Sequence, residues 1–295
     1  MTASTSPAGA SAPTETRADE LPVMAEPYVL PPPVGPQALM RELGPSAPFR
    51  WLADGWRDLK AQPGIGLFYG LCFWLMAVTL GAVFSARPEY TLTMASGCLL
   101  VGPFLALGLY EVSRRRELGL SPELGASLTC WKAHLRSMAM LVLVLIVLEL
   151  LWGRAALVVF AVFFNTGIPS STGVIQAVFN PDNLEFVAVY LAVGGMFAAL
   201  VFSCAVVSIP MILDRDTDAI SAAITSIRVV FSNPGVMLLW GVLLTALIAL
   251  ALLPWGLGLV VIGPLLGHAS WHAYRGAVRW LEEAPAIQVA PSGQN

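Results

Sequence analysis

The chain has 295 residues, of which 57% are hydrophobic and only 12% are charged. An ordinary soluble domain has about 25% charged residues, so this deficit excludes a typical water-soluble domain and indicates lipid as the main solvent. The net charge of −3, with no tract rich in lysine and arginine, excludes nucleic acid as an expected partner.

The two ends of the chain differ in composition from its middle. Residues 1–45 are rich in proline, alanine, serine, threonine and glutamate, and the run Pro31-Pro32-Pro33 cannot form a helix. This segment lacks the basic start and apolar core of a signal peptide, so we predict a disordered cytoplasmic tail. Residues 282–295 are predicted to form a second polar cytoplasmic tail, which leaves 46–281 as a membrane domain.

The middle of the chain repeats one pattern three times, at about 49–116, 121–216 and 218–280. Each unit begins with a helix whose apolar residues recur every three or four positions, which places them on one face. The three apolar stripes are Phe49, Leu52, Trp56 and Leu59; Leu124, Leu128, Trp131 and Leu135; and Ile220, Ile224, Ile227 and Phe231.

Each of these helices is followed by two apolar runs. A helix needs about 20 residues to cross the hydrocarbon core of a membrane, and the runs are close to that length. They cover residues 66–84, 90–110, 138–164, 186–213, 236–253 and 255–271. The sequence therefore predicts an all-α polytopic membrane protein with six transmembrane helices, arranged as three hairpins, each preceded by an amphipathic interfacial helix.

Basic residues mark one side of the predicted membrane domain, whereas the opposite loops hold only Arg87 and Arg154. The positive-inside rule therefore predicts that both termini are cytoplasmic. The basic clusters are Arg41, Arg50, Arg57 and Lys60; Arg114, Arg115, Arg116, Lys132 and Arg136; Arg215 and Arg228; and Arg275 and Arg279.

The first and third units share more than periodicity. Gln62-Pro63-Gly64 matches Asn233-Pro234-Gly235, and Tyr69-Gly70 and Trp240-Gly241 follow these prolines at the same distance. The match predicts a duplicated unit, with a weaker copy in the middle.

A proline recurs in the second span of every unit. Val101-Gly102-Pro103 matches Ile262-Gly263-Pro264, and the middle unit has Pro210 at a comparable place. Because a proline within a span tends to kink the helix, we predict a kink in each returning span. The kinks are interpreted as a packing device; the alternative is that they open a cytoplasmic cavity.

Several motifs in the chain resemble those of a known family. They are Gly55-Trp56-Arg57-Asp58-Leu59, Tyr110-Glu111-Val112-Ser113-Arg114, Pro210-Met211-Ile212-Leu213-Asp214 and Gly267-His268-Ala269-Ser270-Trp271-His272-Ala273-Tyr274-Arg275. Over roughly residues 50–280 the chain resembles an uncharacterised bacterial integral membrane protein family, domain of unknown function 2189. The resemblance implies the bacterial inner membrane and no particular activity. Four polar residues of these motifs are functional candidates: Arg57, Asp214, Tyr274 and Arg275.

The chain has three histidines, which are weak candidates for binding a cofactor. His268 and His272 lie four residues apart, hence on one face of a helix, where two nitrogens can share a metal ion or one can ligate haem. The alternative is that they bond to backbone carbonyls and lipid headgroups. His134 joins them only if the second and third units pack together. We expect no firmly bound metal, with haem or copper left as an open alternative.

Two glutamates near span ends are further candidates. Glu149 lies inside the third span with Arg154 near its outer end, and ionisable groups in a membrane are costly enough to suggest a function. The alternative is that both reach the outer interface. Glu111 closes the second span, where we expect it to pair with an arginine of the interfacial helices. The arginines that follow Glu111 can bind anionic lipid headgroups.

No nucleotide-binding or nucleophile-elbow motif is present in the sequence, so we do not expect an enzyme. The predicted function is a non-enzymatic membrane scaffold or assembly factor whose partners are the lipid bilayer and other membrane proteins. Two alternatives remain open. A small-solute transporter or channel requires polar residues around a cavity near the bilayer midplane. A haem- or copper-binding protein associated with respiratory oxidases requires a set of ligands.

Overall fold

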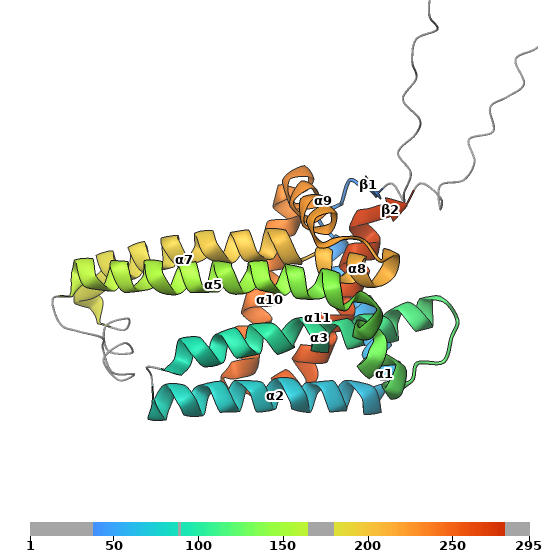
Figure 1. Ribbon diagram of the computed structural model, residues 1–295, viewed down its shortest axis with the longest axis horizontal. Coiled ribbons are helices and arrows are strands. Elements are labelled where there is room, and N and C mark those ends of the chain that lie inside the picture. Colours follow the sequence, from blue (N-terminus) through green and yellow to red (C-terminus); the bar gives the residue numbers. More distant parts are fainter. Residues whose placement is uncertain (1–37, 88–89, 165–179, 281–295) are drawn as a thin grey trace, which may run out of the picture. The chain divides into compact units, whose positions relative to one another are not determined.

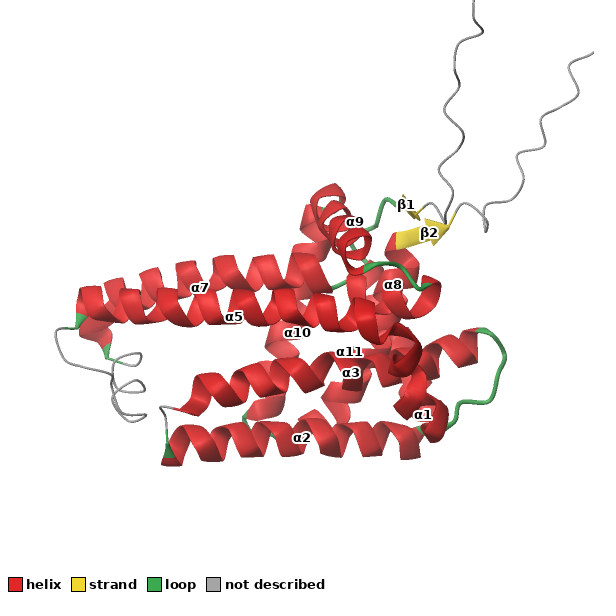
Figure 2. Cartoon of the chain, in the orientation of Figure 1, coloured by secondary structure: helices red, strands yellow, loops and turns green. Residues whose placement is uncertain are grey.

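The structure is a computed structural model that describes residues 38–87, 90–164 and 180–280. These ranges are almost entirely helical, apart from two short strands that pair with each other (Figure 1, Figure 2). Most of the predicted tails, residues 1–37 and 282–295, lie outside the described residues.

The helices follow one another along the chain with short connections. The first predicted unit contains α1 (Ala47–Ala61), α2 (Pro63–Ala86) and α3 (Thr91–Glu117). The second contains α4 (Leu124–Thr129), the 3₁₀ helix η2 (Cys130–His134), α5 (Leu135–Phe163), the 3₁₀ helix η3 (Pro181–Asn183), α7 (Leu184–Ala205) and α8 (Ser208–Arg215). The third contains α9 (Ala219–Ser232), α10 (Pro234–Leu252) and α11 (Leu259–Ala277).

Four helical segments of the described chain are long and apolar enough to cross a membrane. They are Pro63–Ala86, Leu124–Phe163, Leu184–Arg215 and Pro234–Leu252. Large apolar side chains such as Leu75, Leu143 and Leu238 are exposed on them, which suits a surface that faces lipid rather than water. The second and sixth predicted spans fall on α3 and α11. The structure thus has several membrane-spanning helices.

Proline fixes where two of these helices begin. Pro63 and Pro234 are the first residues of α2 and α10, a position that needs no N–H donor. The residues before them have nearly the same backbone angles, φ −134° and ψ 61° at Gln62 and φ −132° and ψ 53° at Asn233. Because a residue before proline avoids the helical region, α1 and α9 end there with the same bend.

The fourth predicted span, 186–213, is interrupted. Helix α7 ends at Ala205 and α8 begins at Ser208, so Pro210 is the third residue of a new helix. The Val207 N–H leaves the helical pattern and donates to the Ser226 hydroxyl of α9, at 3.1 Å. The predicted kink at Pro210 is therefore a break that precedes the proline, whereas Pro103 and Pro264 lie inside continuous helices.

Each amphipathic helix packs on the returning helix of another unit. Helix α1 packs on α11, α4 and η2 pack on α3, and α9 packs on α7 and α8. Two aromatic residues at matching positions reach the next amphipathic helix. Trp240 of α10 meets Trp51 of α1 edge to face at 5.5 Å, and the Tyr69 hydroxyl of α2 donates to Ser127 of α4 at 3.0 Å. The α1–α11 contact brings the first and last helices together.

The apolar stripes of these helices point away from the protein. On α1, Phe49 is 55% exposed and Trp56 is 42% exposed, while Trp51, Gly55 and Asp58 are buried. The same division holds on α9, where Ile220 and Phe231 are exposed and the buried residues include Ala222 and Ser226. The outward apolar face suits an amphipathic helix that lies in a membrane interface.

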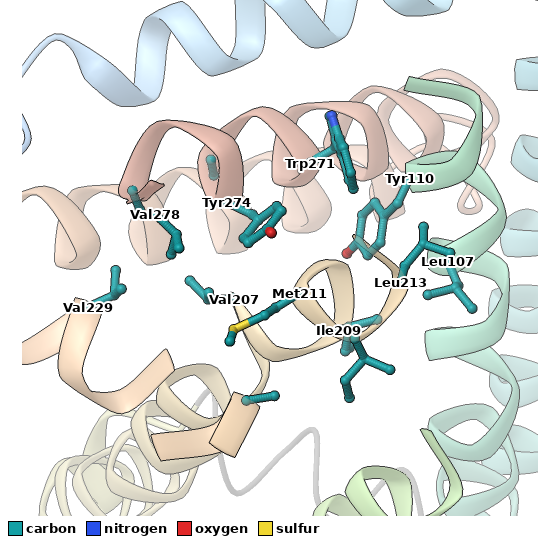
Figure 3. Packing of buried hydrophobic residues seen from close by; sticks show 14 of the residues in the cluster. Leu107, Tyr110, Val207, Ile209, Met211, Leu213, Val229, Trp271, Tyr274 and Val278 are labelled. Carbon is teal, nitrogen blue, oxygen red and sulfur yellow. The ribbon is translucent and has the colours of Figure 1, made fainter. Parts of the chain in front are cut away.

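The core lies where the C-terminal parts of α3 and α11 meet α8. Leu107 and Tyr110 of α3, Ile209 and Leu213 of α8, and Trp271 of α11 gather in one buried cluster (Figure 3). Their side chains fill the space between the three helices at this end.

The short strands hold the N-terminal segment to this core. Strand β1 (Ala38–Met40) pairs antiparallel with β2 (Val278–Trp280). The Arg41 N–H then donates to the Ala277 carbonyl at 2.9 Å, and the Leu43 N–H to Asn233 Oδ1 at 2.9 Å. Residues 38–45 therefore belong to the fold, because their backbone groups find partners, and the predicted disordered tail is too long by these residues.

We expect Asn233→Ala to release this segment. Asn233 is buried, and its amide accepts from Leu43 and donates to the Arg41 carbonyl at 3.1 Å. Its loss leaves both backbone groups without partners, a cost of about 2 kcal/mol in the free energy of unfolding. Limited trypsin digestion should then cut after Arg41 faster than in the wild type. The neighbouring Ser232→Ala is the control, and equal rates in both variants would contradict this role of Asn233.

Candidate functional site

Buried polar side chains gather where α1, α3 and α11 meet. Asp58 of α1, Ser113 of α3 and His268 of α11 are all buried, although each has a polar or ionisable group. The three helices pack directly on one another. Such groups are costly to bury unless they are paired, so their contacts decide what the site does.

Asp58 is the centre of this cluster. Its Oδ2 accepts from the Ser113 hydroxyl at 2.6 Å and lies 2.8 Å from His272 Nε2. Its Oδ1 bonds to the guanidinium of Arg116 from α3. Ser113 Oγ is also 2.8 Å from Nδ1 of His268. We call these five residues the Asp58 network.

The contacts fix the hydrogen positions in the network. Ser113 has one hydroxyl hydrogen, and the 2.6 Å approach to the Asp58 carboxylate assigns it to Asp58. Nδ1 of His268 must therefore donate to Ser113, which leaves Nε2 of His268 without a hydrogen. That Nε2 is buried and has no hydrogen-bond partner of normal geometry. The network holds His268 as a neutral ring.

Asp58 is ionised at neutral pH. Burial is the largest influence and by itself raises the pKa of the carboxyl, but hydrogen bonds from His272 and Ser113 and the charges of both histidines lower it. The pKa of Asp58 therefore lies below its usual 3.8. A partly buried carboxylate is thus stabilised by donors from two neighbouring helices.

This pKa shift predicts a loss of stability in acid. Because the folded-state pKa of Asp58 is lower than its unfolded value of 3.8, the ionised side chain stabilises the fold above that pH. The contribution is lost as the pH falls through the folded pKa. Below pH 3.8 we expect the apparent melting temperature to fall more steeply in the wild type than in Asp58→Asn. Parallel curves would show that Asp58 does not contribute.

A second group of polar contacts joins the ends of α3, α8 and α11. The Tyr274 hydroxyl donates to Asp214 Oδ2 at 2.6 Å, and Trp280 Nε1 donates to the same hydroxyl at 3.0 Å. Glu117 of α3 accepts from Trp271 Nε1 and from Arg275 Nε, both at 3.0 Å. These contacts tie the returning helices of all three predicted units to one another.

The structure places several predicted candidates in these two groups. His268 and His272 belong to the Asp58 network, and Asp214, Tyr274 and Arg275 belong to the second group. We expected Glu111 to pair with an arginine of the interfacial helices. Its partner at 2.8 Å is instead Arg114, one turn later on α3, because that side chain is within reach on the same helix face.

The other candidates lie elsewhere. His134 pairs with Asp216 at 2.8 Å, apart from the other two histidines. Arg57 is largely exposed and pairs with Asp54 of its own helix. Glu149 is half-buried on α5, and Arg154 is exposed.

Sequence reasoning did not select Asp58, Ser113, Arg116 or Glu117. Asp58 follows Trp51 and Gly55 at a helical spacing, and these three residues form the buried side of α1. That alternation of small, polar and aromatic residues opposite the apolar stripe was the available signal, because helix contacts in membranes favour small and polar residues.

We tested whether the histidines fit a haem or copper site. No group of three or more His, Cys, Asp or Glu side chains in the described ranges is arranged to hold a metal ion. Neither His268 nor His272 lines any of the three pockets described next. The rings are held by Ser113 and Asp58 instead, so the described residues do not fit these cofactors.

Three pockets lie among the helices. The first, of about 370 Å³, lies between α2, α3, α10 and α11 and reaches Tyr110 and Ser270. The second, of about 440 Å³, is polar and is lined by residues that include His134, Arg136 and Asp218. The third, of about 590 Å³, lies between α7, α9 and α10.

The comparisons with known proteins found one family. The family model of DUF2189, described as a predicted integral membrane protein, matches residues 91–214. No curated protein and no solved structure matches the chain. The matched stretch runs from the start of α3 almost to the end of α8, so it contains Ser113, Arg116 and Asp214. Over residues 91–214, therefore, the expected resemblance to domain of unknown function 2189, a family of predicted integral membrane proteins, is confirmed.

Proposed function

We propose that the chain is a non-enzymatic membrane scaffold or assembly factor of the bacterial inner membrane, with six spans and both termini in the cytoplasm. The observation that carries the proposal is the interlocked core at the ends of α3, α8 and α11. Large side chains fill the space between these helices, and the Asp58 network and the Glu117 and Asp214 contacts tie them together. Such a core gives a rigid platform rather than a path through the membrane.

The arrangement of three related units supports this topology. In each unit the amphipathic helix packs on the returning helix of a different unit, and the order α1 on α11, α4 on α3 and α9 on α7 closes a cycle. The matching bends at Gln62 and Asn233, and the matching buried positions of Tyr69 and Trp240, agree with a duplication. Three hairpins that start and end on one side of the membrane would bring their charged ends together, as the contacts of Asp214 and Glu117 require.

The first pocket speaks against the transporter alternative. A carrier of polar solutes needs polar groups around a site near the bilayer midplane. The residues that line this pocket, such as Phe73, Met76 and Leu244, are apolar except for Tyr110 and Ser270 at one end and Cys98. Those hydroxyls bond to each other rather than face an aqueous path.

The exposed apolar stripes and the basic residues agree with anionic lipid as a partner. Stripes such as Phe49 and Trp56 can enter the interface, where Arg50 and Lys60 on the same helix are exposed. Basic residues beside an inserted apolar face attract anionic headgroups.

Two measurements on the full chain test the proposal. In sealed proteoliposomes we expect the flux of protons, potassium and small organic ions to equal that of protein-free vesicles. A saturable flux, reduced when Ala106→Trp fills the first pocket, would establish a transporter instead. Ala106 lines that pocket, and Leu143→Trp on the exposed face of α5 is the control.

The second measurement looks for a client. Purification in gentle detergent at native expression should recover one membrane protein in a fixed ratio, and deletion of the chain should lower the assembled amount of that same protein. An assembled membrane proteome that does not change on deletion would contradict the scaffold role. An optical absorbance band lost in His268→Ala/His272→Ala protein would replace it with a haem protein.

A further inference from the structure

One boundary between units is packed differently from the other two. The returning helix α3 packs directly on α5, and α11 packs directly on α2, so each meets the outgoing helix of the next unit. The corresponding pair, α7 and α10, makes few close contacts. A groove of about 590 Å³ lies between them, and the end of α9 forms its third side.

Small residues form the walls of this groove. Gly195, Ala199 and Ser203 recur every four positions on α7, and Gly241, Thr245 and Ala249 do so on α10. Both helices belong to segments that are apolar and long enough to span the membrane, so the groove lies at the depth of the lipid chains. Its walls leave a space that neither helix fills.

The width of the groove selects its occupant. A methyl group added at Gly241 would meet the ring of Phe202 at 3.8 Å, so one aromatic side chain from α7 spans the gap to α10 at this level. A helix with its side chains is about 10 Å across and cannot enter a gap of this width. An extended hydrocarbon chain can, and the surrounding bilayer supplies such chains.

Basic residues lie at the end of the groove that α9 closes. Val230, Phe231 and Pro234 line that end, and the exposed Arg228 precedes them on α9. Asn233, which directly precedes Pro234, accepts from Leu43 and donates to the carbonyl of Arg41, so the exposed Arg41 belongs to the same junction. Two guanidinium groups at the interface suit the phosphate of a lipid headgroup.

We propose that the groove between α7 and α10 binds one acyl chain of an anionic phospholipid, with its phosphate at Arg41 and Arg228. The lipid takes the place that direct helix packing takes at the other two unit boundaries. The inference requires that the protein lies in a membrane, but it does not require the scaffold role.

A photoreactive lipid tests the proposal. The full chain is reconstituted with phosphatidylglycerol that has a diazirine on one acyl chain, and cross-linked peptides are mapped after illumination. We expect cross-links concentrated in residues 195–203 and 241–249. Ala199→Phe, which fills the groove from α7, should lower the cross-linking there about tenfold. Leu191→Phe on the same helix is the control, because Leu191 is 66% exposed and does not line the groove.

Further variants keep the outcome decisive. Ala246→Phe fills the groove from α10 and should have the same effect as Ala199→Phe if either variant alone disturbs folding. Arg41→Gln/Arg228→Gln should remove the preference for phosphatidylglycerol over phosphatidylcholine, whereas Arg50→Gln on α1 should not. Cross-links spread evenly over all exposed faces would overturn the proposal. Protein cross-links from position 199 into a helix of another chain would assign the groove to a protein partner instead.

Discussion

Asp58→Ala should lower the free energy of unfolding by about 3 kcal/mol, because it leaves His272, Arg116 and Ser113 without their common acceptor. For a chain of this size the loss corresponds to about 6–12 °C in the apparent melting temperature. The measurement is thermal unfolding of the purified protein in one detergent, followed by tryptophan fluorescence. Asp58→Asn, which keeps one acceptor oxygen, should fall between the wild type and the alanine variant.

The control for this prediction lies on the same helix. Asp54 pairs only with Arg57 at the surface of α1, and exposed pairs of this kind contribute about 0–1 kcal/mol. We therefore expect Asp54→Ala to unfold within a few degrees of the wild type. If both alanine variants unfolded at the same temperature, the Asp58 network would not hold α1, α3 and α11 together.

Gly70→Val should have the largest effect of any single substitution on α2. A Cβ atom at this position would lie 2.0 Å from the carbonyl oxygen of Val260, so the backbones of α2 and α11 touch there. No rotamer relieves a clash with backbone, and the helices must separate, at a cost of more than about 3 kcal/mol. Size-exclusion chromatography in detergent should show a strong loss of monodisperse protein.

Gly81→Val is the matched control for this substitution. Gly81 lies on the same helix, and a Cβ there would meet nothing within 4 Å. Valine is also no worse than glycine in a helix, so the control should behave as the wild type. Equal yields of monodisperse Gly70→Val and Gly81→Val protein would show that α2 and α11 are not packed backbone to backbone.

The helices were predictable from the sequence because their signals are local. The apolar runs, the periodic stripes and the prolines at 63 and 234 each act through a few neighbouring residues. The break between α7 and α8 was not predictable, because it depends on Val207 finding the Ser226 hydroxyl on a helix later in the chain.

The candidate site was harder to predict because lipid changes the meaning of an apolar stripe. In water the stripe Phe49, Leu52 and Trp56 would face the core, whereas here Phe49 and Trp56 are exposed and Asp58 is buried. Periodicity locates such a helix but does not say which side meets the protein. His268 and His272 were found because their spacing is visible in the sequence, while their partners Ser113 and Asp58 come from helices more than 150 positions away.

The central claim is that three hairpins begin and end on the same side of the membrane. The most direct test is single-cysteine labelling with a membrane-impermeant maleimide, in a chain whose four native cysteines are replaced by alanine. Exposed residues at six positions are suitable, namely Lys60, Lys132 and Arg228 for the inner side and Arg87, Asp182 and Trp255 for the outer side. In intact cells only the cysteines at 87, 182 and 255 should react, and those at 60, 132 and 228 should react after the membrane is opened. Labelling of position 132 from outside, together with an unreactive position 60, would mean that α3 does not cross the membrane and would contradict the account.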